Sequence, residues 1–308
     1  MKRISFFLIT FFLCITSYAQ QALWGGQDII SPDIQEDNTV TFRLNAPQAG
    51  KVELTGDFLP TQKIETPFGA FDGPGVTELT KNDKGVWEYT TPKALAPELY
   101  SYAFVIDGVK VTDPSNVYMI RDVASVTSMF IIGGGRSDLY KVNSVLHGTV
   151  ARCWYDSPTL KMSRRLTVYT PPKYEQGKEN YPVLYLMHGV GGDEEAWMAL
   201  GRTAQILDNL IAQQKAKPMI VVMTNGNSYQ EAAPGESSLG LYKPSIGMDK
   251  AMDGETEEAF PDIVNFIDTN YRTIKQKSGR AIGGLSMGGF HSMHISKEYP
   301  CFRKHTCR

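Results

Sequence analysis

Near the carboxyl end of the chain, Gly284-Leu285-Ser286-Met287-Gly288 places a serine midway between two glycines. The glycines permit a sharp turn without Cβ clashes, so the serine hydroxyl can stand exposed. Ala281 and Ile282 favour a strand before the turn, and residues 289–298 can continue as a helix. A serine on a strand–turn–helix of this kind is suited to attack an acyl carbon. A tight glycine turn in an ordinary α/β protein is the alternative interpretation.

A second glycine-rich segment, His188-Gly189-Val190-Gly191-Gly192, directly follows an apolar run. Its glycines let backbone N–H groups approach a bound acyl group. The N–H groups of Gly189 and Val190 could join that of Met287 in an oxyanion hole. The alternative is a flexible strand-to-helix loop in which residues 193–195 are only favourable charges at a helix start. The two motifs in this order indicate an acyl-transfer site more strongly than either alone.

The elements that must position these motifs alternate in the second half of the chain. We expect strands at 165–170, 182–187, 219–223 and 280–285, with amphipathic helices around 207–211 and 260–267. This alternation predicts a parallel sheet layered by helices.

The first half of the chain has a different pattern. Short alternating runs such as Val40, Phe42 and Leu44 continue from about 39 to 130, and Asp107-Gly108 suits a tight hairpin turn. We therefore expect a β-sandwich over residues 28–130, a flexible linker at 131–144, and a helix-layered domain from 145 to 308.

Residues 1–19 are typical of a secretory signal. Lys2 and Arg3 precede an apolar run, and small residues at Ser17 and Ala19 predict cleavage after Ala19. A lipoprotein signal at Cys14 is the less favoured alternative, because Leu13 precedes it where a small residue is expected. We predict a periplasmic or secreted protein without a stable membrane anchor.

Composition excludes several classes of function. The 308 residues carry 31 basic and 33 acidic side chains, a net charge of −2, which becomes −4 without Lys2 and Arg3. This balance argues against a nucleic-acid partner. We expect no metal and no cofactor, because the sequence has neither a metal-ligand cluster nor a nucleotide loop. Three cysteines after the leader, Cys153, Cys301 and Cys307, are an odd number for a disulfide framework.

The residues from His188 to Glu194 and from Gly283 to Gly289 resemble the esterase D-like branch of the α/β-hydrolases, which includes the feruloyl and acetyl xylan esterases of carbohydrate esterase family 1. The resemblance runs from about 145 to 300. The first half resembles the immunoglobulin-like, early-set, glycogen-binding-like sandwich found before such domains, at residues 42–47, 56–58, 85–87 and 113–116. The resemblance implies an α/β-hydrolase domain with Ser286 as nucleophile and Met287, Gly189 and Val190 as oxyanion-hole amides.

The chain departs from that family pattern after the serine. The family places an acid and then a histidine on later loops, whereas only 22 residues follow Ser286. His291 and His294 lie on the helix predicted directly after Ser286, which we call the elbow helix. The basic, cysteine-rich residues 301–308 have no buried-strand pattern. We therefore expect a carboxyl-terminally truncated hydrolase domain, without the triad acid and base, and little or no activity.

Three functions remain open at this level. The first is a secreted serine esterase that hydrolyses acyl esters on plant polysaccharide through an acyl-enzyme. The second is a non-catalytic carbohydrate-binding protein, in which aromatic residues of the sandwich, Trp87 above all, would stack on sugar rings. The third is acyl transfer to a sugar, as in the related mycolyltransferases. In each case we expect acylated plant polysaccharide or oligosaccharide as the partner.

Overall fold

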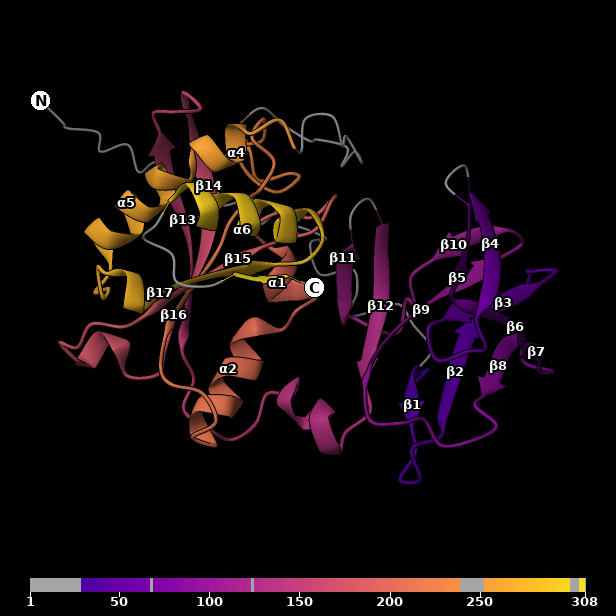
Figure 1. The fold of residues 1–308 in the computed structure, drawn as a ribbon. Helices are drawn as coiled ribbons and strands as arrows, with labels where there is room; N and C mark the ends of the chain where they lie inside the picture. Colours follow the sequence, from indigo (N-terminus) through magenta and orange to yellow (C-terminus); the bar gives the residue numbers. More distant parts are fainter. Residues whose placement is uncertain (1–28, 67–68, 123–124, 239–251, 300–304, 308) are drawn as a thin grey trace, which may run out of the picture.

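The computed structural model describes residues 29–66, 69–122, 125–238, 252–299 and 305–307. The predicted signal at 1–19 lies outside these residues. The described chain forms a β-sandwich followed by a sheet covered by helices, and the two lie against one another (Figure 1). Within the described residues, no helix is long and apolar enough to cross a membrane.

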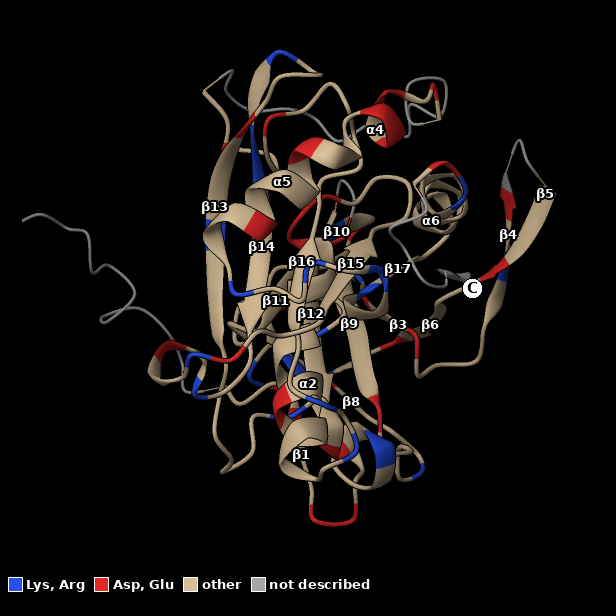
Figure 2. Ribbon diagram, turned by 60° about the vertical axis from the view of Figure 1, so that its left-hand side comes forward, with Lys and Arg blue, Asp and Glu red and all other residues tan. Residues whose placement is uncertain are grey.

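The sandwich consists of two antiparallel sheets. The first has the strand order β1 (Asp33–Ile34), β2 (Val40–Asn45), β8 (Val86–Thr90), β7 (Thr80–Lys81). The second has the order β11 (Met119–Asp122), β12 (Ser125–Ile131), β9 (Leu99–Ile106), β3 (Val52–Gly56), β6 (Gly75–Glu78), with β10 (Val109–Val111) also paired to β9. A separate hairpin, β4 (Gln62–Thr66) and β5 (Gly69–Gly73), extends away from the sandwich in Figure 2.

The alternating pattern predicted the sandwich core correctly. Val40, Phe42 and Leu44 are all buried and pack with residues of the second sheet such as Leu54 and Phe104. The hairpin is also confirmed, because Asp107 and Gly108 adopt φ of 48° and 89° between β9 and β10. Such a turn matches the twist of the paired strands.

The expectation that Trp87 contacts sugar is wrong. Its side chain is only 6% exposed and belongs to the sandwich core. The indole N–H donates to the carbonyl of Ala46 at 2.9 Å. A ring held inside the sandwich has no open face for a ligand, and strand alternation turns it inward.

The second domain is a single six-stranded sheet in the order β13 (Thr149–Ser157), β14 (Met162–Thr170), β16 (Ile220–Met223), β15 (Val183–Met187), β17 (Arg280–Gly284), β18 (His305–Cys307). Strands β16, β15 and β17 are parallel, as predicted, and β18 adds a parallel strand that the sequence did not predict. The prediction fails for β13 and β14, which pair antiparallel with each other, as do β14 and β16. The short β13–β14 connection allows only an antiparallel pair.

The tail also differs from expectation. Its sequence has no buried-strand pattern, yet His305–Cys307 pairs with β17 at the edge of the sheet. Backbone hydrogen bonds can form a short edge strand without an apolar pattern.

Helices cover both faces of this sheet. On one face, α5 (Phe260–Asn270) and α6 (Met287–Glu298) pack Ile263, Ile267 and Ile295 against the strands. On the other face, α2 (Thr203–Ala212) packs Leu207 against Val221 and Met223. The shorter elements are η3 (Tyr174–Gln176), α1 (Ala196–Ala199), α4 (Glu255–Glu258) and η4 (Lys277–Gly279).

The segment between the domains is hydrogen-bonded to both of them. It contains η2 (Gly135–Leu139), where the buried Ser137 hydroxyl donates to the Ile132 carbonyl at 2.6 Å. The Asn209 side-chain amide on α2 donates to the carbonyls of Leu139 and Lys141 at 3.0 and 2.9 Å. These contacts fix a segment whose glycines suggested a flexible joint. The domain limits predicted from the sequence stay a prediction.

Candidate active site

Ser286 lies at the junction between β17 and α6, as the pentapeptide predicted. Its backbone has φ of 79° and ψ of −106°, and the residue is exposed. A positive φ is unfavourable for a residue with a Cβ and persists only where surrounding structure enforces it. Here β17 pairs with β15 on one side and α6 begins at Met287 on the other. The hydroxyl is thus held outward above the end of the parallel strands.

The two glycines of the motif are required by close backbone approach. A Cβ on Gly284 would lie 2.5 Å from the Gly288 carbonyl, and one on Gly288 would lie 2.3 Å from the Met187 oxygen. Both distances are far below any normal contact. The glycines therefore let helix α6 begin directly against β15, which produces the sharp turn at Ser286.

The second glycine motif lies beside the serine. A Cβ on Gly189 would be 3.6 Å from the Ser286 Cβ, so the two residues are neighbours. Within the described residues, the backbone N–H groups of Gly189, Val190 and Met287 donate to no acceptor. Met287 is the first residue of α6, where N–H groups have no partner inside the helix. Three amides without an acceptor beside one serine are the arrangement that an oxyanion requires.

His188 fixes this loop. It is buried, its Nδ1 lies 2.7 Å from the Gly189 carbonyl, and its Nε2 accepts the Gly226 N–H at 2.8 Å. The imidazole must therefore be neutral, with its proton on Nδ1. Burial lowers the pKa of His188 to about 4, which agrees with this assignment. Because both nitrogens are engaged with the backbone, His188 is not a base for Ser286.

Three acidic residues after the glycines anchor the same loop. The buried Glu194 carboxylate accepts from the Arg165 guanidinium at 2.8 Å, from the Ala233 N–H at 2.8 Å and from the Asn225 amide at 3.0 Å. Burial raises the pKa of Glu194, and the hydrogen bonds from the Ala233 N–H and from Arg165 oppose that rise. Glu195 is bound by both Arg152 and Arg165.

Asp193 connects the loop to the sandwich. Its buried carboxylate is paired with the Arg121 guanidinium on β11 and also accepts the Glu195 N–H at 3.0 Å. The three acids thus do more than favour a helix start. The sequence analysis did not predict that these three acidic residues hold the loop in place. Three consecutive acidic residues after a buried strand and a glycine motif were a signal for such contacts.

A buried pair joins the elbow helix to α4. His291 is 0% exposed, and its Nδ1 lies 2.7 Å from Oε1 of the buried Glu257. Burial acts to raise the pKa of Glu257, but the hydrogen bond and charge of His291 outweigh it, and the net shift is downward. Next to Glu257, Thr256 donates to the Gly226 carbonyl at 2.8 Å. The Gly226 N–H also donates to His188. This buried chain of contacts therefore connects α6 to residues 188–195, which we call the oxyanion loop.

The other described histidines do not reach Ser286. His147 is paired with Asp208 on α2 at 3.0 Å, and the exposed His294 packs against the Phe290 ring at a tilted angle. Within the described residues, no side chain is hydrogen-bonded to the Ser286 hydroxyl. The side chain of His305 lies outside what the structure describes. No group of three or more potential metal ligands occurs among the described residues.

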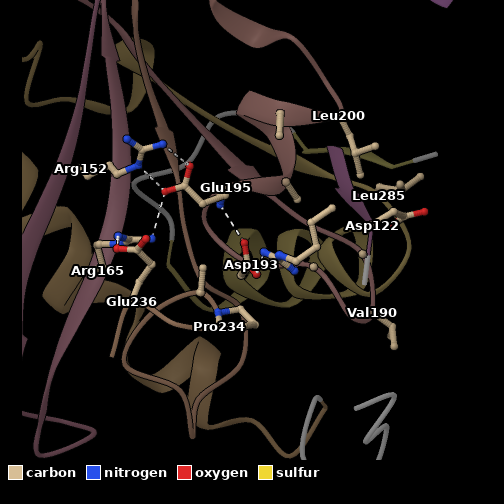
Figure 3. A pocket seen from close by; sticks show the side chains of 16 residues that line it. Asp122, Arg152, Arg165, Val190, Asp193, Glu195, Leu200, Pro234, Glu236 and Leu285 are labelled. Carbon is tan, nitrogen blue, oxygen red and sulfur yellow. Dashed lines mark hydrogen bonds and ion pairs between the residues drawn. The ribbon is translucent and has the colours of Figure 1, made fainter. Parts of the chain in front are cut away.

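A cavity of about 300 Å³ opens beside the oxyanion loop. Figure 3 shows Val190 and Leu285 on one side of it and Arg152 and Arg165 on the other. Asp122 and Arg121 of β11 complete the wall, so the sandwich contributes to the cavity. Leu285 is 53% exposed and directly precedes Ser286, which places the serine at the rim.

The sheet, the turn at Ser286 and the amide-lined loop together have the architecture of an α/β-hydrolase domain. Residues 157–302 match the family described as "Putative esterase", and residues 30–119 match carbohydrate-binding module 48, the isoamylase N-terminal domain. The second domain of the chain is therefore similar to that esterase family, and the first is similar to carbohydrate-binding module 48. The resemblance inferred from the two glycine motifs and the sandwich is confirmed.

Curated relatives and solved structures agree with this assignment. The chain is 30% identical over 275 residues to an endo-1,4-beta-xylanase/feruloyl esterase of Xylanibacter ruminicola, covering 87% of this chain and 34% of the relative. It is 27% identical over 205 residues to an esterase of Mycobacterium tuberculosis, covering 65% of this chain and 40% of the relative. The chain thus spans well under half of either protein.

The enterochelin esterase of Shigella flexneri shares the fold. Its structure superposes with a TM-score of 0.60 at 14% identity, covering 89% of this chain and 71% of the other. At that identity the likeness concerns the fold alone. It extends over both domains of the chain.

Proposed function

We propose that this chain is a serine carboxylic-ester hydrolase for feruloyl or acetyl esters on plant polysaccharide. The observation that carries the proposal is Ser286, held at a positive φ beside three amides that have no acceptor within the described residues. The Xylanibacter relative, named as a xylanase and feruloyl esterase, supports the substrate class. The carbohydrate-binding module 48 match supports a polysaccharide ligand.

The proposed reaction follows from the site. The Ser286 oxygen attacks the ester carbonyl, whose oxygen becomes an oxyanion bound by the N–H groups of Gly189, Val190 and Met287. The leaving alcohol departs with a proton, and the acyl group stays on Ser286. Water then attacks the acyl-enzyme and releases the acid.

The rate depends on a base for the serine proton. Within the described residues, no imidazole is bound to the Ser286 hydroxyl. We propose that Ser286 acts through oxyanion-hole binding alone, because no imidazole is bound to it among the described residues. Oxyanion-hole binding alone supports only residual catalysis, roughly 10³–10⁴-fold above water in a serine hydrolase without its triad. We therefore expect slow turnover.

The test is hydrolysis of p-nitrophenyl acetate and methyl ferulate by the purified chain. We expect slow release of both acids, abolished by Ser286→Ala. Ser296→Ala is a matched control on the same helix, because that hydroxyl is exposed and donates to Met293 at 2.9 Å. If Ser286→Ala hydrolyses the esters as fast as the parent chain, the proposed nucleophile is wrong.

Two other outcomes distinguish the remaining functions. Transfer of the acyl group to an added xylo-oligosaccharide, in preference to water, would identify an acyltransferase. Retardation in gels containing xylan, without any Ser286-dependent turnover, would identify a carbohydrate-binding protein.

We also propose export to the periplasm or the medium. The positively charged start, apolar run and small residues of positions 1–19 support it. Expression of the full chain in a bacterium, followed by amino-terminal sequencing of the exported protein, is expected to read from Gln20. A cytoplasmic protein that retains residues 1–19 would contradict export.

A further inference from the structure

The outward face of β13 carries an exposed tryptophan at the edge of the hydrolase sheet. Along this strand Val150, Arg152 and Trp154 point outward, with Val150 39% and Trp154 48% exposed. Tyr155 is buried and packs with Phe266 of α5 on the other face. Strand alternation therefore places three neighbouring outward side chains in one row.

This row is continuous with the wall of the cavity beside Ser286. Trp154 pairs with Arg165 across β13 and β14, and directly opposed residues project from the same face. Arg152 and Arg165 both line the cavity. Figure 3 shows them across the cavity from Leu285 and Val190. Trp154 thus lies beside Arg165 of the cavity wall, on the edge strand β13, and β17 before Ser286 is four strand positions away.

Trp154 differs from the other tryptophans that the structure describes. The indole N–H of Trp87 donates to Ala46, and that of Trp197 donates to the Met187 carbonyl at 3.0 Å. Trp154 has an exposed ring, and its N–H has no acceptor within the described residues. An exposed indole with an available donor can offer a ligand both an apolar face and a hydrogen bond.

The distance along the sheet indicates an extended ligand. From β13 to β17 there are four strand spacings, which at roughly 4.8 Å each is about 19 Å. That span exceeds one sugar ring or one feruloyl group. The polar residues that line the cavity include Arg152, Glu195 and Glu236, which can exchange hydrogen bonds with hydroxyl groups.

We propose that Trp154 is a stacking platform for the sugar backbone of the polysaccharide whose ester reaches Ser286. A pyranose ring presents an apolar face of C–H groups and a rim of hydroxyls. The face would pack on the indole, and the rim would meet Arg152 and the neighbouring carboxylates. This inference rests on the proposed esterase function for the position of the ester, but the binding itself is separate from turnover.

Affinity electrophoresis of the full chain in gels with soluble feruloylated arabinoxylan tests the binding. We expect the parent chain to be retarded, Trp154→Ala and Trp154→Gln to migrate freely, and Trp154→Phe to retain most of the retardation. Phe71→Ala is the matched control, because Phe71 is 50% exposed on the separate β4–β5 hairpin. Thermal unfolding of each variant verifies the fold.

Kinetics on two substrates test the link to the site. For Trp154→Ala we expect about tenfold slower release of ferulate from the polymer, equivalent to ~1.4 kcal/mol of lost binding, and unchanged hydrolysis of methyl ferulate. Equal retardation of the parent and both non-aromatic variants would overturn the platform. Trp154-dependent retardation in a chain without Ser286-dependent turnover would support the platform and overturn the esterase function instead.

Discussion

At Ser286 a strained backbone and an exposed hydroxyl occur in the same residue. A positive φ at a non-glycine residue raises its energy by roughly 1–3 kcal/mol, which the packing of β17 and α6 must offset. The strained turn places the Ser286 side chain beside the Gly189 loop. The position of this one residue therefore depends on the neighbouring residues that hold the turn.

His188 is the residue whose protonation most directly affects this loop. Its folded pKa of about 4 lies below the ordinary value of 6.5, so the unfolded chain binds the proton more tightly. Stability from this group is therefore complete above pH 6.5 and is lost as the pH falls toward 4. The shift corresponds to about 3 kcal/mol at most.

We expect the free energy of unfolding to fall between pH 6.5 and 4, and to fall less in His188→Gln. A glutamine amide can still accept the Gly226 N–H but does not titrate. Urea unfolding at several pH values measures both slopes. Buried carboxyl groups with raised pKa, such as Asp113 and Glu194, act in the opposite direction in both proteins, so the difference isolates His188. Identical slopes would contradict the assignment.

At the scale of elements, the elbow depends on how closely α6 approaches β15. Gly288 faces the Met187 carbonyl, and the neighbouring Ser292 hydroxyl donates to the Gly288 carbonyl at 2.6 Å. The Glu257–His291 pair then joins α6 to α4. The turn at Ser286 therefore depends on the packing of β15, α6 and α4. Gly288 lies at the contact between α6 and β15.

We expect Gly288→Ala to lower the free energy of unfolding by at least about 2 kcal/mol, because its Cβ would lie 2.3 Å from the Met187 oxygen. Gly189→Ala is the matched comparison for stability, since its Cβ would meet ordinary contacts at 3.5–3.7 Å. Urea unfolding of both variants measures the difference. Equal stability of Gly288→Ala and the parent chain would refute the close approach.

At the scale of the whole molecule, the sandwich contributes to the site. Arg121 on β11 pairs with the buried Asp193 of the oxyanion loop, and Arg202 donates to the Tyr118 hydroxyl. The segment 135–141 is also bound by α2. The sandwich therefore both contacts the loop beside Ser286 and forms one wall of the cavity.

We expect Arg121→Ala to destabilise the chain by roughly 2–3 kcal/mol, because it leaves the Asp193 carboxylate buried without its cation. It should also slow hydrolysis of methyl ferulate by disturbing the oxyanion loop. Lys63→Ala, which breaks an exposed ion pair with Asp72, is the control and should change neither. Unfolding and ester turnover are measured together. An unaffected rate in Arg121→Ala would show that the sandwich does not position the loop.

The sequence by itself determined the two-domain order, the strands of the sandwich core and the serine elbow. Each of these depends on local patterns: alternation in Val40, Phe42 and Leu44, and glycines that flank Ser286. Local sequence also pointed to the glycine loop at Gly189, which the structure places beside Ser286, and its role as an oxyanion hole stays a prediction. It failed for Trp87, because alternation does not show which face of a strand is covered.

Only the tertiary structure decided the contacts between distant segments. The pairs Arg121–Asp193 and Glu257–His291 join residues far apart in the chain, and the cavity wall combines residues of the sandwich with residues of the second domain. Ion pairs and hydrogen bonds between distant residues produce no periodic pattern in the sequence. Many acidic and basic side chains could pair, and the sequence does not show which of them meet in the fold. The sheet order and the packing of the sandwich bring the partners together, and these are set by burial across the whole molecule.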